Sequence, residues 1–123
     1  MASGVKGFGR LWKACGYSLQ GFRAAWRHEA AFRQELTIAV LLLPAAGWLA
    51  RDALEFALLV ATLLLVLVVE LLNSGIEAIV DRVGTERHEL SGRAKDLGSA
   101  AVLLSLVMAV VVWGAIAWTR FGG

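Results

Sequence analysis

The feature that most constrains this chain is a long run without charge, residues 56–69, that ends in a set of polar groups. Glu70, Asn73, Glu77 and Asp81 follow the run. On a helix that turns by about 100° per residue, these four side chains fall within about 80° of one another. Carboxylates at membrane depth are costly, and they usually face a protein interior or a site. The pattern therefore predicts a membrane helix with a functional site on one stripe.

The alternative is that the stripe only holds helices together. Polar residues in membrane helices often form hydrogen bonds with neighbouring helices. That explanation would serve well for a single polar residue. It serves less well for this set, because its three carboxylates repel one another unless a cation joins them.

The composition indicates one membrane-integral domain over residues 1–123. Of the 123 residues, 59% are hydrophobic, which is too many for an ordinary soluble domain. The net charge is +2, and the basic residues cluster near the predicted membrane surface, so a membrane explains them better than nucleic acid does. The only cysteine, Cys15, is expected to be a small buried hydrophobe.

The sequence predicts an all-α membrane protein with a surface helix and three transmembrane helices. Over about residues 7–27, apolar side chains recur every three or four positions with basic residues between them, as in a helix at the membrane interface. Spans are expected at about residues 30–50, 53–80 and 97–119. The first span has only about 15 uncharged residues, so it must recruit the turn at 30–32 to approach the usual length of about 20. Residues 81–96 are expected to form a polar loop.

Lysine and arginine predict the orientation in the membrane. The N-terminal flank carries six of them, the segment 81–96 carries four, and the opposite side carries only Arg51 and Arg120. Cytoplasmic segments are enriched in these residues, so the N-terminus and the segment 81–96 are expected in the cytoplasm. Tryptophans at positions 48, 113 and 118 then mark the outer interface, and those at 12 and 26 mark the inner one.

Depth along the second span suggests the chemistry. From Ala53, Glu70 lies about 25 Å along a helix and Glu77 about 35 Å. The hydrocarbon core is about 30 Å thick, so Glu70 is expected at its inner boundary and Glu77 among the headgroups. A lipid hydroxyl could give a proton to Glu70. Glu77, with Glu29, could hold Mg²⁺ together with substrate phosphates. This geometry suits transfer from a cytoplasmic donor to a membrane-bound acceptor.

No known phosphate-binding loop is present, so a nucleotide site would have to be built from the helices. Several stretches are specific as a set: Arg-Ala-Ala-Trp at 23–26, Glu-Ala-Ala-Phe-Arg-Gln-Glu at 29–35, Glu-Leu-Leu-Asn-Ser-Gly-Ile-Glu at 70–77, Asp-Arg at 81–82, His-Glu-Leu-Ser-Gly-Arg-Ala-Lys-Asp at 88–96 and Gly-Ser-Ala-Ala at 98–101. The pattern closely resembles the prokaryotic, membrane-integral diacylglycerol kinases over nearly the whole chain. It departs from the family at Cys15, Leu19 and Gln20.

The resemblance implies a homotrimer in the bacterial inner membrane, with active sites shared between subunits. The implied reaction transfers phosphate from ATP to diacylglycerol and gives phosphatidate. By match to the family, Glu70 is the proton acceptor, while Glu29 and Glu77 hold the Mg²⁺ that bridges the ATP phosphates.

The resemblance also implies which residues bind the two substrates. Those expected at ATP are Arg10, Tyr17, Glu29, Glu77, Glu86, Arg87, His88, Lys95 and Asp96. Those expected at the lipid are Arg10, Ala14, Ser18, Leu19, Arg23, Trp26, Ala31, Arg33, Glu35, Trp48, Arg51, Phe56, Glu70, Asn73, Ser99, Trp113 and Trp118. Without the resemblance, residues 86–89 would read as a solvated charged turn and Lys95 as an anchor whose ammonium reaches the membrane surface.

Two other functions stay open at this point. An undecaprenol kinase would use the same fold and chemistry on a polyprenol acceptor. A small proton-coupled transporter would explain a carboxylate such as Glu70 within a span. It would not explain why Glu77, Asp81, Lys95 and Asp96 gather on the cytoplasmic side.

Overall fold

Four helices make up the chain in a computed structural model that describes residues 4–84 and 88–122, with side chains from Gly7 onward. They are α1 (Gly4–His28), α2 (Ala30–Leu49), α3 (Ala53–Val83) and α4 (Glu89–Phe121). Within the described ranges there is no strand. The predicted all-α class is therefore confirmed.

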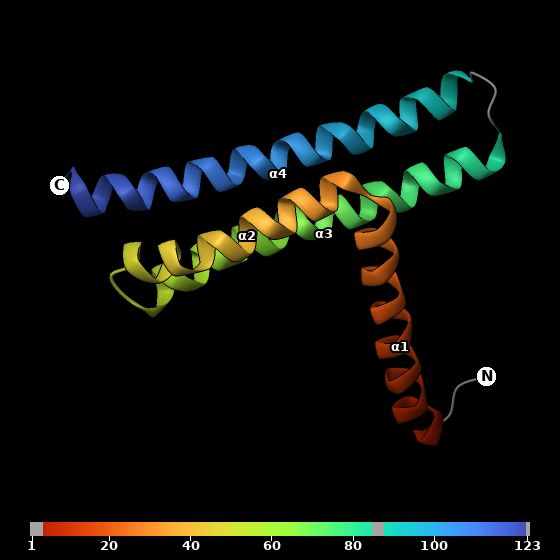
Figure 1. Ribbon diagram of the computed structural model, residues 1–123, viewed down its shortest axis with the longest axis horizontal. Coiled ribbons are helices and arrows are strands. Elements are labelled where there is room, and N and C mark those ends of the chain that lie inside the picture. The colour runs from red at the N-terminus through yellow and green to blue at the C-terminus, as the bar shows by residue number, and fades with distance from the viewer. Residues whose placement is uncertain (1–3, 85–87, 123) are drawn as a thin grey trace.

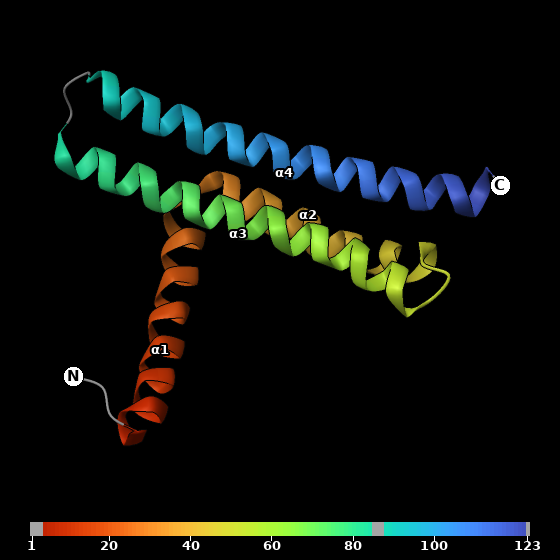
Figure 2. The same cartoon turned by 180° about the vertical axis from the view of Figure 1, so that it is seen from behind.

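The last three helices run alongside one another, and α1 leaves them at a steep angle (Figures 1 and 2). Helix α3 packs against α4 and also against α2. The α2–α3 turn and the C-terminal end of α4 lie at one end of this bundle, which we call the turn end. The C-terminal end of α3 and the N-terminal end of α4 lie at the opposite end, which we call the polar end.

Side chains fix where the helices begin and end. The Asp52 carboxylate accepts a hydrogen bond from Glu55 N at 2.9 Å and starts α3. His88 Nδ1 accepts one from Leu90 N at 3.0 Å and starts α4. Both satisfy backbone N–H groups that a helix leaves without partners. At the end of α1, Arg33 Nη1 donates to the carbonyl of Trp26 at 2.7 Å, and to that of Arg27 at 3.3 Å.

A small apolar core closes the turn end. Ala46, Leu49, Leu59 and Ile116 are buried together there, from three different helices. Many large apolar side chains elsewhere on α3 and α4 stay exposed. Exposed apolar surface on this scale indicates contact with lipid or with other protein.

By length and composition, α3 and α4 are the two helices in the described residues that are able to cross a membrane. The predicted first span coincides with α2, which is not among them. Its role as a third span stays a prediction.

Two expectations were wrong. The polar loop expected at 81–96 is mostly helical, because α3 continues to Val83 and α4 already starts at Glu89. Hydropathy marks where a helix enters an apolar layer, whereas charged residues such as Lys95 are good helix formers and extend the helix beyond it. Cys15 is exposed rather than buried, because it lies on α1, which leaves the bundle.

Candidate functional site

The polar stripe of α3 runs from a buried start to an exposed end. Glu70 and Asn73 are only 5% and 8% exposed, which places them inside the helix bundle. Glu77 is half-buried, and Asp81 is exposed at the polar end. The stripe therefore runs from the interior of the bundle to its polar end.

A second carboxyl group lies beside Glu70. Glu35, on α2, comes within hydrogen-bonding reach of Glu70. Its Oε2 is buried and has no hydrogen-bond partner among the described residues. Sequence reasoning placed Glu35 with the lipid contacts and did not link it to Glu70, because their approach depends on how α2 packs against α3.

Asn73 faces a glycine across the α3–α4 interface. A Cβ atom built on Gly98 would overlap Asn73 Oδ1, so the absence of a side chain lets the amide lie there. Asn73 Oδ1 and the neighbouring Ser74 Oγ are both buried without a partner in the described part of the chain. Ser99, which was also predicted at the acceptor end, is exposed. Asn73 thus carries an amide oxygen that is available to a further group.

An ion pair joins α3 and α4 at the polar end. Lys95 Nζ lies 2.8 Å from Asp81 Oδ1, and both side chains are partly exposed. The hydrogen bond to Asp81 raises the pKa of Lys95, and the charge of Glu77 raises it further. Lys95 therefore stays positively charged, and it lies close to Glu77, a predicted metal ligand. Sequence reasoning did not pair it with Asp81.

Glu29 sits in the one-residue joint between α1 and α2, where it lines a groove of about 580 Å³. Ser18 and Phe22 of α1 and Ser74 of α3 line the same groove. Among the described residues, no group of three or more His, Cys, Asp or Glu could hold a metal ion. Glu29 and Glu77 thus offer carboxylate oxygens without completing a metal site on their own.

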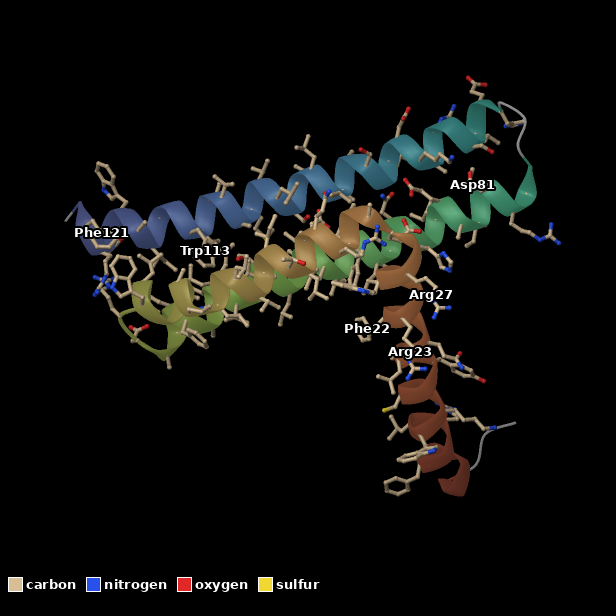
Figure 3. The ribbon with its side chains drawn as sticks, viewed as in Figure 1. Phe22, Arg23, Arg27, Asp81, Trp113 and Phe121 are labelled. Atoms are coloured by element: carbon tan, nitrogen blue, oxygen red, sulfur yellow. The ribbon has the colours of Figure 1, made fainter. Side chains whose placement is uncertain are left out.

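A second groove, of about 430 Å³, opens where α1 meets α2 and α3. Its walls are mainly apolar and include Phe22, Phe32 and Leu67. Arg23 and Arg27 line it from α1, and Figure 3 shows them on the part of that helix nearest the bundle. An apolar groove with cations beside it suits a lipid whose polar end carries oxygen atoms.

Other predicted residues lie apart from this region. Arg10, Ala14, Tyr17 and Leu19 are exposed on α1, while His88 and Asp96 are exposed at the polar end. Ala31 is exposed at the start of α2. Glu86 and Arg87 lie outside the described residues. Within a single chain, some predicted ATP contacts therefore lie on α1 and others lie at the polar end.

Five predicted lipid contacts lie at or near the turn end, away from Glu70: Trp48, Arg51, Phe56, Trp113 and Trp118. Several of them have partners inside the chain. The Trp113 indole donates to Thr62 Oγ1 at 3.0 Å, and Arg51 forms an ion pair with Glu55 at 2.6 Å. The Trp48 ring lies 5.4 Å from that of Phe121. These contacts also serve to pack the helices.

Comparison with known proteins gives a consistent result. The sequence model of a family described as prokaryotic diacylglycerol kinase matches residues 16–117. A diacylglycerol kinase from Escherichia coli strain K12 is 54% identical over 122 residues, which cover 99% of this chain and 100% of that protein. One from Pseudomonas aeruginosa is 53% identical over 113 residues, 92% of each chain. One from Helicobacter pylori is 48% identical over 110 residues, 89% of this chain and 86% of that protein.

Proposed function

Because the chain belongs to the prokaryotic diacylglycerol kinase family, and is therefore an enzyme that phosphorylates diacylglycerol, we propose how its own residues perform the reaction. ATP is the phosphoryl donor, and phosphatidate forms at the cytoplasmic face of a bacterial inner membrane. The observation that carries the activity is the match to a diacylglycerol kinase over 99% of the chain. The transporter alternative is set aside because these relatives are kinases.

Glu70 is the general base in this proposal. It takes the proton of the diacylglycerol hydroxyl as that oxygen attacks the γ-phosphorus of ATP. Its burial inside the bundle supports this role, because a carboxylate shielded from water interacts strongly with a nearby proton donor. The unpartnered oxygen of Asn73, one turn further along α3, is free to accept a hydrogen bond from the lipid's polar end.

Glu29 and Glu77 would hold Mg²⁺ with the ATP phosphates. The donor set fits, because Mg²⁺ is usually bound by one or two carboxylates plus substrate phosphates and water. When bound, the ion neutralises negative charge on the transferring phosphoryl group. Lys95 stays protonated beside Glu77 and attracts the nucleotide phosphates. Arg10, Tyr17, His88 and Asp96 complete the proposed nucleotide contacts, together with residues 86 and 87.

A homotrimer with three spans per subunit would bring the separated residues together. Arg10 and Tyr17 lie on α1, far along the chain from Lys95, and α1 extends away from the bundle (Figure 1). The exposed apolar faces of α3 and α4 leave room for other subunits. In such a trimer, α1 of one subunit lies over the polar end of another.

The activity can be tested with purified protein in mixed micelles. Labelled ATP is offered with diacylglycerol in one sample and with undecaprenol in another. We expect labelled phosphatidate in the first and much slower labelling in the second. Faster phosphorylation of undecaprenol would favour the sister activity, and no dependence on ATP would exclude ATP as the donor.

A further inference from the structure

Buried oxygen atoms around Glu70 lack hydrogen-bond donors among the described residues. Glu35 contributes a carboxyl group from α2, and Asn73 contributes an amide oxygen from α3. Glu35 Oε2 and Asn73 Oδ1 have no partner in the described ranges. Buried polar atoms in native proteins are nearly always paired, so a missing donor needs an explanation.

No cation among the described residues supplies that donor. Arg33, two positions before Glu35, donates to carbonyls at the end of α1. Lys95 pairs with Asp81 at the polar end. On α4, residues 97–119 contain no charged side chain. In the described parts of the chain, neither Glu35 nor Glu70 forms an ion pair.

Two carboxyl groups this close cannot both be ionised at low cost. Like charges repel, and burial removes the water that would screen them. A single proton between the groups removes the repulsion and provides the missing donor. The hydrogen bond from a carboxylic acid to a carboxylate is short and about twice as strong as a neutral one.

We propose that Glu35 carries this proton and donates it to Glu70 in a hydrogen bond that keeps Glu70 ionised and oriented for catalysis. Glu35 is then a positioning residue for the base, beyond the lipid contact that the family resemblance suggests. This inference rests on the proposed role of Glu70.

The reaction balances with this pair. The O–H bond of diacylglycerol breaks, and its proton moves to the free oxygen of Glu70. The same hydroxyl oxygen forms a bond to the γ-phosphorus as the bond to ADP breaks. The pair then holds two protons, and one passes to water before the next turnover.

The pH dependence of kcat tests the proposal through two substitutions at Glu35. Glu35→Gln keeps an N–H donor for Glu70. We therefore expect kcat to fall on the acid side at about the same pH as in the wild type. Glu35→Leu removes the donor, so kcat at neutral pH should fall roughly 10–100-fold and the acid side should move up by about one to two pH units. Thr37→Val, on the same helix, is the control and should leave the profile unchanged.

Equal losses in both Glu35 variants with an unmoved profile, or a rise in the lipid KM alone, would show that Glu35 only contacts lipid. An infrared spectrum of the resting enzyme gives a readout without turnover. At neutral pH we expect a protonated-carboxyl band that Glu35→Gln removes. If the wild type lacks this band, no proton is shared. If Glu70→Gln keeps full activity, the base assignment fails whatever the infrared result.

Discussion

The turn end and the Glu70 region use the same helices in opposite ways. At the turn end, polar groups find partners within the chain: Arg51 pairs with Glu55, and Trp113 donates to Thr62. Around Glu70, oxygen atoms of Glu35, Asn73 and Ser74 are buried without a partner among the residues that the structure describes. One region is completed by its own sequence, whereas the other is left to be completed by protons or ligands. The proposed chemistry lies in the region where oxygen atoms lack partners among the described residues.

The largest expected difference between the regions is the effect on kcat of replacing a glutamate, Glu70 in one region and Glu55 in the other. Glu70→Gln keeps the shape but cannot accept the proton, so kcat should fall about 10²–10⁴-fold. Glu55→Gln at the turn end changes the same chemical group and should leave kcat near the wild-type value. Rates are measured with diacylglycerol in mixed micelles. Similar rates for both variants would remove the functional distinction between the regions.

Mixing subunits tests whether the Glu70 region is completed by another chain. Glu70→Gln and Glu29→Gln proteins, each inactive alone, should recover activity when unfolded and reassembled together. Recovery requires one site to draw Glu29 and Glu70 from different subunits. Mixed oligomers without recovery would place each site within a single chain.

Glu77→Gln should raise the Mg²⁺ concentration needed for half-maximal rate by at least roughly 10–100-fold, the usual cost of disturbing even the outer partners of a metal. The reason is that one of only two proposed carboxylate ligands loses its charge. A Mg²⁺ titration of the rate measures this, and Glu55→Gln is again the matched control. An unchanged titration would show that Glu77 is not a ligand.

Two glycines of α4 allow a steric comparison. A Cβ at Gly98 meets Asn73 Oδ1, whereas a Cβ at Gly114 meets nothing within 4 Å. Gly98→Ala should turn the Asn73 amide aside and lower kcat roughly 10-fold or more. Gly114→Ala should keep kcat and stabilise its helix by about 0.5–1 kcal/mol. Rates and thermal unfolding in detergent measure both, and equal rates would mean that the Asn73 amide needs no fixed position.

The smallest effect concerns the Asp81–Lys95 pair. Because the pKa of Lys95 is raised above its ordinary 10.5 in the folded protein, the pair stabilises the fold below that pH and loses its effect as the pH rises through the raised value. The thermal unfolding temperature should therefore fall more at alkaline pH in the wild type than in Asp81→Asn. Parallel curves would mean that the pair contributes nothing to stability.

Spacing along one helix was enough to predict part of the site. The helical class and the burial of Glu70 and Asn73 on one face follow from periodicity and hydropathy. The approach of Glu35 to Glu70 and of Asn73 to Gly98 does not, because each depends on the packing of two helices. The start of α4 at Glu89 was missed because hydropathy reports the apolar layer rather than the helix. The distance from Arg10 to the polar end could not be predicted, since it depends on the direction of α1.

That direction is set at a single residue. Glu29 is the only residue between α1 and α2, and helical hydrogen bonds continue on both sides of it. Arg10 lies about 28 Å from this joint at the usual rise of a helix, so a turn of roughly 10° there displaces it by about 5 Å. The joint therefore acts as a hinge at which a small rotation is amplified along α1. Arg33 donates hydrogen bonds to the carbonyls of Trp26 and Arg27 and so holds the end of α1 beside α2. The position of the distant Arg10 therefore depends on two hydrogen bonds close to the joint.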